Sequence, residues 1–234
     1  MNKTEILPFA DSHREYPVRG YFHIPANASG DGLVITHGAG SNCQSPLLIA
    51  LATSFSESGM TVLRCDLNFR LLRPNGPPPR GSAERDQQGL RSAIATMRLK
   101  VPGRVFLGGH SYGGRQASML AASDATLVDA LLLLSYPLHP PKRPSELRTT
   151  HFPTLHTPAL FVHGTRDAFA TNEELAAALK LIPARTELLS IEDAGHELMT
   201  SRNRSYLLEA IPAVFAAFSS GALPTLSIAP NAAL

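Results

Sequence analysis

Short apolar segments alternate with helix-like segments along the chain, and this alternation is what most limits the folds open to it. The apolar segments are 32–38, 61–67, 104–110, 130–136, 159–164 and 187–193. They are apolar almost throughout, which is the pattern of strands buried on both faces of a parallel sheet. Helices are expected at 46–58, 82–99, 113–122, 172–181 and 205–218. We therefore predict an α/β fold, a mainly parallel central sheet flanked by helices on both faces.

The segments outside this alternation are expected at the borders of the sheet. EILPFA and VRGYFHIP, near the start, are predicted to pair as antiparallel strands at one sheet edge. The segments 68–85 and 137–158 are rich in proline and are predicted to be loops over the carboxyl edge of the sheet, where open α/β folds bind ligands. No separate cap domain is expected.

Composition points to a single globular domain, predicted at 1–218, followed by a C-terminal tail at 219–234. A net charge of only +2 predicts no general binding to nucleic acid or to an anionic membrane. The first residues lack the apolar core of a signal peptide, so the cytoplasm is the expected location. Cys43 and Cys65 are expected to be reduced thiols, and neither CxxC nor HExxH occurs, so no metal or cofactor is expected.

The stretch GGHSYGGR contains the pattern G-x-S-x-G, centred on Ser111. It follows a predicted strand and precedes a predicted helix, the setting in which a tight turn presents a serine hydroxyl above a sheet. Glycines at 109 and 113 relieve the crowding of such a turn. The alternative is an ordinary glycine-rich turn with a solvated serine, and the strand–turn–helix context favours a nucleophile.

A serine nucleophile needs a base, and the base needs an orienting acid. Among nine histidines, His196 follows the final predicted strand, and Asp167 follows the strand before it. The order Ser111, Asp167, His196 is the serine–acid–histidine order of one hydrolase architecture. Asp167 could instead be a turn or helix-cap residue. Glu192 and Asp193 are less suitable acids because they are close to His196 in sequence.

Two backbone N–H groups are expected to bind the oxyanion. One is that of Tyr112, directly after the nucleophile, and the other is that of Ala39 in the glycine-containing segment THGAGSN. His37 is expected to shape this segment rather than to react.

These stretches together resemble the α/β-hydrolase superfamily, with the likeness running from about Gly32 to Phe218. At a finer level the chain is similar to the dienelactone-hydrolase-like branch. Within that branch it resembles the testis-expressed α/β-hydrolase-like proteins and the hydrolase-like domain of a histone-acetyltransferase complex subunit. The resemblance implies the fold and a triad. Dienelactone hydrolases proper use a cysteine nucleophile, whereas this chain has Ser111, so their substrate is not carried over.

The patterns favour a serine hydrolase that acts on a small ester, or on a thioester or amide, through an acyl-enzyme. One alternative is a protein-interaction module that kept the fold with little or no activity. Another is a triad used for lyase or acyl-transfer chemistry. Several arginines lie near the same sheet edge, and those chosen as candidates for binding an acidic group of the substrate are Arg70, Arg80 and Arg115. The alternative is that they pair with Asp66, Glu84 or Asp86 and hold the proline-rich loop.

Overall fold

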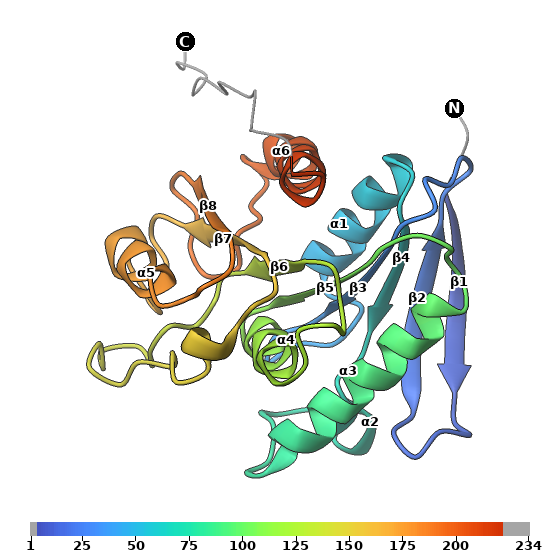
Figure 1. Cartoon of the computed structure of the whole chain (residues 1–234), viewed down its shortest axis with the longest axis horizontal. Coiled ribbons are helices and arrows are strands. Elements are labelled where there is room, and N and C mark those ends of the chain that lie inside the picture. Colours follow the sequence, from blue (N-terminus) through green and yellow to red (C-terminus); the bar gives the residue numbers. More distant parts are fainter. Residues whose placement is uncertain (1–3, 222–234) are drawn as a thin grey trace.

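The computed structural model describes residues 4–221, which form a central sheet covered by helices (Figure 1). The strands are β1 (Glu5–Asp11), β2 (Val18–Ile24), β3 (Gly32–Thr36), β4 (Thr61–Cys65), β5 (Val105–His110), β6 (Leu131–Leu134), β7 (Ala159–Gly164) and β8 (Thr186–Ile191). The helices are α1 (Pro46–Glu57), α2 (Asn68–Leu72), α3 (Ser82–Arg98), α4 (Tyr112–Ser123), α5 (Asn172–Leu179) and α6 (Arg204–Ser219), with a 3-10 turn η1 (Phe152–Thr154).

The strands form one sheet in the order β1-β2-β4-β3-β5-β6-β7-β8. From β4 to β8 every neighbouring pair is parallel, whereas β2 runs antiparallel to both β1 and β4. The predicted antiparallel pair at one edge is therefore confirmed. Because β3, β5, β7 and β8 all end at the same edge, the loops that follow them meet there.

Both faces of the sheet are buried, which explains the continuous apolar runs of the sequence. Helices α3, α4 and α5 cover one face, while α1 and α6 cover the other (Figure 1). Along β3, for example, Val34 packs into the first core and its neighbours Leu33 and Ile35 into the second, all with 0% exposure. The predicted α/β fold with helices on both faces is confirmed.

The loop prediction for 68–85 was wrong over its first residues, because Asn68–Leu72 forms helix α2. The backbone N–H of Phe69 donates to Oδ1 of the buried Asp86 (2.8 Å), so the start of α2 is fastened to α3. Segment 137–158 is irregular apart from η1. No cap domain is inserted within residues 4–221.

Helix α6 ends at Ser219, and residues 222–234 of the predicted tail lie outside the described residues. The domain boundary at residue 218 stays a prediction. None of the helices within 4–221 combines the length and the apolar character needed to cross a bilayer.

Candidate functional site

Ser111 lies between the end of β5 and the start of α4, at the carboxyl edge of the sheet. Its backbone has φ 52° and ψ −118°, a conformation that residues with a side chain rarely adopt. A Cβ on Gly109 would lie 2.5 Å from the carbonyl carbon of Gly113, and a Cβ on Gly113 would lie 2.5 Å from the carbonyl oxygen of His37. Only glycine fits at these two positions, as the sequence pattern predicts.

His196 and Asp167 reach Ser111 from the loops after β8 and β7. His196 Nε2 lies 2.8 Å from Ser111 Oγ. On the other side of the ring, His196 Nδ1 lies 2.8 Å from Asp167 Oδ2 and 3.1 Å from Oδ1. The structure thus brings the three predicted residues into one hydrogen-bonded chain. The rival acids lie elsewhere, since Asp193 pairs with Arg166 and Glu192 accepts from Thr165.

The carboxylate of Asp167 is fully buried and held from two sides. Its Oδ1 also accepts from the backbone N–H of Phe169 (2.9 Å). Burial by itself raises the pKa of Asp167, but the hydrogen bonds from His196 and Phe169 outweigh it and leave the pKa below its usual value. Asp167 is therefore ionised at neutral pH and can stabilise a positive charge on His196.

Two residues that the sequence analysis missed hold His196 in place. The Phe169 ring packs on the His196 imidazole, with the ring centroids 4.1 Å apart at an interplanar angle of 30°. His110 Nε2 donates to the backbone carbonyl of His196 (2.8 Å), and burial lowers the pKa of His110, which favours its neutral form. The sequence signal that could have identified His110 was its position inside the G-x-S-x-G pattern, directly before Ser111. Phe169 offered none beyond its closeness to Asp167.

The two predicted oxyanion donors belong to segments that adjoin Ser111 in the chain or approach it in space. Tyr112 is the first residue of α4, so its N–H has no acceptor within the helix. Ala39 follows Gly38, and a Cβ on Gly38 would lie only 3.4 Å from Ser111 Cβ, which shows how closely this loop approaches the serine. The Tyr112 hydroxyl donates to Asp86 Oδ2 (2.8 Å). This bond fixes the Tyr112 side chain to helix α3, which carries Asp86.

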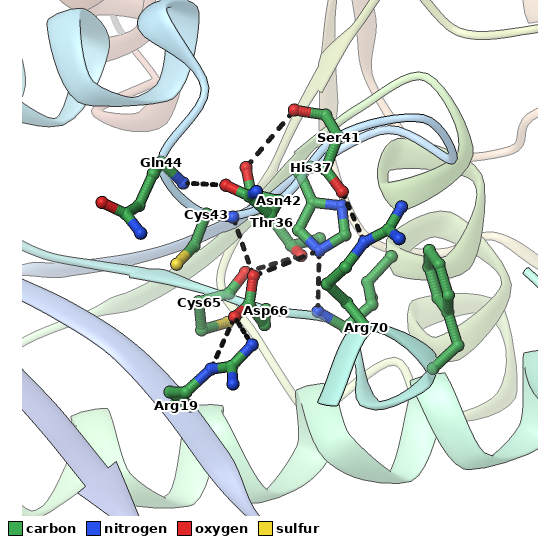
Figure 2. A network of polar contacts seen from close by, with 12 residues as sticks. Arg19, Thr36, His37, Ser41, Asn42, Cys43, Gln44, Cys65, Asp66 and Arg70 are labelled. Carbon is green, nitrogen blue, oxygen red and sulfur yellow. Dashed lines mark hydrogen bonds and ion pairs between the residues drawn. The ribbon is translucent and has the colours of Figure 1, made fainter. Parts of the chain in front are cut away.

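Buried polar groups fasten the loop that carries Ala39, as Figure 2 shows. His37 Nδ1 donates to the carbonyl of Gly38 (2.8 Å), and its Nε2 accepts from the N–H of Leu67 (3.1 Å). Further along the loop, Asp66 Oδ1 accepts from the N–H of Cys43 (2.8 Å). His37 therefore shapes this loop, as expected.

Two buried histidines, His23 and His37, predict that the protein loses stability in mild acid. Burial lowers the pKa of both His23 and His37 to about 4, below the unfolded value of about 6.5. The unfolded chain then binds more protons between these values, so the free energy of unfolding should fall as pH drops from 6.5 to 4. The slope should be about 1.4 kcal/mol per pH unit for each histidine, measured by urea unfolding at several pH values.

The control for this prediction uses the exposed His13. His23→Gln can still accept from Arg64, whose Nε donates to His23 Nε2 (2.8 Å), and it should reduce the slope by about one proton. His13→Gln should leave the slope unchanged. A slope that is the same in all three proteins would contradict the assignment of the acid sensitivity to His23.

The contacts of Arg70 do not fit the predicted role in substrate binding. Arg70 is 3% exposed, and its Nε donates to the carbonyl of Ser41 (2.7 Å), as Figure 2 shows. Its Nη2 donates to the carbonyl of Ala39 (2.8 Å). Its Nη1 donates to the carbonyl of Arg73 (3.0 Å). The guanidinium is thus committed to backbone carbonyls, and the contacts favour a positioning role for the Ala39 loop. The sequence missed this because carbonyl positions depend on the folded loop.

The other two candidate arginines occupy different surroundings. Arg80 is exposed, beside a cavity of about 240 Å³ that is also lined by Phe69 and Ser82. Arg115 is half-buried, one turn after Ser111 on α4. Within the described part of the chain, neither side chain pairs with an acidic residue, so the alternative in which they pair with Asp66, Glu84 or Asp86 is not observed.

Both cysteines are free and buried, as expected. Burial raises the pKa of Cys43 to about 12 and that of Cys65 further, which keeps both as unreactive thiols. Within residues 4–221 no three His, Cys, Asp or Glu side chains lie together as a metal site would require.

Comparison with known proteins agrees with this architecture. Residues 30–217 match the family described as "alpha/beta hydrolase domain". A dienelactone hydrolase from Anabaena variabilis superposes with a TM-score of 0.70 at 22% identity, covering 95% of this chain and 100% of that one. Est1E from Butyrivibrio proteoclasticus, with ferulic acid bound, gives a TM-score of 0.73 at 16% identity, covering 91% and 99%. An alpha-beta serine hydrolase homologue from Coxiella burnetii gives 0.68 at 17%, covering 87% and 96%. At such identities the likeness to these structures concerns the fold.

Proposed function

Because the chain belongs to the alpha/beta hydrolase family, we propose that it is a serine hydrolase of small esters, with thioesters and amides as further substrates. The observation that carries the proposal is the unbroken series of contacts from Asp167 through His196 to Ser111, at 2.8 Å on either side of the imidazole. A fold into which no cap domain is inserted, as over residues 4–221, suits a small or exposed ester.

In the proposed first half-reaction, Ser111 Oγ attacks the ester carbonyl carbon while its proton moves to His196 Nε2. Asp167 stabilises the resulting imidazolium. The oxyanion accepts from the N–H groups of Tyr112 and Ala39. His196 then returns the proton to the departing alcohol, leaving an acyl-enzyme. In the second half, His196 takes a proton from water as the hydroxide attacks the acyl carbon. His196 then returns that proton to Ser111 Oγ as the bond from Oγ to the acyl carbon breaks, which releases the carboxylic acid.

Active-site labelling tests this proposal. A fluorophosphonate should add one equivalent to the wild type, and peptide mapping should find the adduct on Ser111. The labelled protein should no longer hydrolyse 4-nitrophenyl acetate. Folded protein that takes up no label and turns over no ester would contradict the proposal and favour the interaction-module alternative.

Arg70→Met tests the positioning of the Ala39 loop. The change removes donors to the carbonyls of Ala39 and Ser41, so the Ala39 N–H should be less well aimed at the oxyanion. Removing one oxyanion donor outright costs about 100- to 1,000-fold in kcat. We expect a smaller loss, about 10- to 100-fold, in kcat rather than KM, together with a lower Tm.

The matched control is Arg73→Met, because Arg73 is exposed and is linked to Arg70 through its backbone carbonyl alone. It should keep kcat within about twofold, as surface substitutions do. A fall in Tm for Arg70→Met with kcat unchanged would show that Arg70 supports only stability.

The proposal also retains two finer assignments. One is the relationship to the testis-expressed α/β-hydrolase-like proteins and the histone-acetyltransferase complex subunit. The other is a cytoplasmic location, with which the two free thiols agree.

A further inference from the structure

A cavity of about 580 Å³ lies beside the antiparallel edge of the sheet. The residues that line it come from the end of β1, the start of β2, the segment after β4 and residues 42–44 of the loop after β3. Ser111, Asp167 and His196 are not among them, so this cavity is separate from the candidate site. Its volume falls within the range of about 300–1,000 Å³ that is typical of small-molecule sites.

The charged residues of the lining are two arginines and one aspartate, Arg19, Arg70 and Asp66. Asp66 is 6% exposed, and its Oδ2 accepts from Arg19 Nε (2.8 Å) and Nη2 (2.6 Å), as Figure 2 shows. This ion pair balances the charge of Arg19. Arg70 donates to backbone carbonyls, and within residues 4–221 it pairs with no acidic residue, so its charge stays unbalanced.

A further buried guanidinium, that of Arg64, lies behind the wall of the cavity. Arg64 is 5% exposed and lies over the ring of Tyr21, 4.1 Å from the centroid. Its Nη1 donates to the carbonyl of Cys43 (2.7 Å), and Tyr21 and Cys43 both line the cavity. Its Nε donates to His23 (2.8 Å), which is neutral at pH 7 because burial lowers the pKa of His23 to about 4. The surroundings of the cavity therefore carry an excess of positive charge, which favours an anionic ligand.

Arg19 retains donors for such a ligand. Asp66 occupies only the edge of the guanidinium formed by Nε and Nη2, and no group within residues 4–221 accepts from Nη1. Asp66 also accepts from the backbone N–H of Cys43 (2.8 Å), so the carboxylate that holds the guanidinium is itself fixed. The free edge formed by Nη1 and Nη2 matches the two oxygens of a carboxylate.

The rest of the lining is largely apolar. It includes Pro8, Phe9, Tyr21 and Pro74. Phe9 is held by edge-to-face packing on the buried Phe22, with the ring centroids 5.1 Å apart. A cavity with an apolar wall and one fixed polar group suits a ligand that has an apolar body and one charged end.

We propose that this cavity binds a small organic acid, with its single carboxylate on the free edge of Arg19 and its apolar body against Phe9 and Tyr21. One carboxylate is expected because Arg19 offers one free edge, while Arg64 and Arg70 contribute charge and keep their donors on the protein. The proposal concerns binding alone and does not depend on the proposed hydrolysis.

Calorimetric titration with 3-phenylpropionate and with 3-phenylpropanamide at pH 7 and low salt tests the site, because the two probes are similar in shape and differ in charge. The wild type should bind the acid at least tenfold more tightly than the amide. Arg19→Met keeps the apolar stem but removes the donors, and it should bring the affinity for the acid down to that for the amide. Arg91→Met is the matched control, because Arg91 also pairs with an aspartate, Asp124 (2.7 Å), but does not line the cavity. It should leave both affinities within about twofold.

Ala10→Trp tests the location without removing the ion pair. Ala10 is exposed and lines the cavity, so an indole ring at this position should occupy part of the space and weaken binding of the acid at least tenfold. An aromatic side chain is well tolerated in a strand. Circular dichroism checks the folding of each variant, and Ala10→Trp decides if Arg19→Met does not fold.

Three outcomes would overturn the proposal: no binding of the acid to the wild type, equal binding of acid and amide, or binding of the acid that is unchanged in either folded variant. The last outcome would place the acid elsewhere, for example beside Ser111. Since the measurement is binding, a wild type that hydrolyses no ester would contradict the hydrolase proposal and leave this test unaffected.

Discussion

Ser111→Ala is expected to lower kcat for 4-nitrophenyl acetate by about five to six orders of magnitude. The substitution removes the Oγ that lies 2.8 Å from His196 Nε2 and leaves the base without a nucleophile to activate. The N–H groups of Tyr112 and Ala39 remain, so a small rate above that in water should persist. Initial rates at saturating ester measure the effect.

The fold should survive this change. The Ser111 side chain makes no capping hydrogen bond to α4, and alanine adopts φ 52° about as poorly as serine. Tm should therefore change by only a few degrees. Ser123→Ala, at the exposed end of the same helix, is the matched control and should retain full activity. Residual activity of a tenth or more in Ser111→Ala would place the nucleophile on another residue.

Asp167→Asn is expected to lower kcat by about four orders of magnitude while it keeps the shape of the site. The N–H of Phe169 donates to Oδ1, so the asparagine oxygen should take that position and its NH₂ group should face His196 Nδ1. Nδ1 must then accept, and the ring proton moves to Nε2, the atom next to Ser111 Oγ. In that tautomer His196 cannot take the serine proton.

Asp193→Asn is the matched control because Asp193 is an exposed acid in the same loop as His196 and pairs with Arg166. It should keep kcat within about twofold. A greater loss in Asp193→Asn than in Asp167→Asn would move the acid to the position that the sequence left as an alternative. In the double variant Ser111→Ala/Asp167→Asn the losses should not add, because the residues act as one unit.

The strands and most helices were predictable because their signals are local. A strand buried on both faces has to be apolar throughout, so β5, β6 and β7 could be read directly from the chain. Helix α2 was not predictable in the same way. It is short and is held by the carboxylate of Asp86, which is 17 residues away from Phe69.

The three residues of the candidate site could be chosen from the chain because parallel topology is a strong constraint. When strands run parallel, the loops that follow them meet at one edge, so order along the chain indicates closeness in space. The roles of the arginines could not be chosen this way. A guanidinium can donate to a carbonyl, a carboxylate or an anionic ligand, so the residue type does not tell which of them an arginine binds. Only the positions of its neighbours in the fold do.

By itself, then, the sequence determined the layered α/β architecture, the strained turn at Ser111 and the order of its partners, because periodicity, glycine and strand ends are local properties of the chain. The tertiary structure alone decided that Arg70 supports the Ala39 loop and that, within residues 4–221, Arg80 and Arg115 pair with no acidic residue. It also decided that His110 and Phe169 hold the His196 imidazole. These depend on contacts between residues far apart in sequence, which exist only after the sheet has brought its carboxyl ends together.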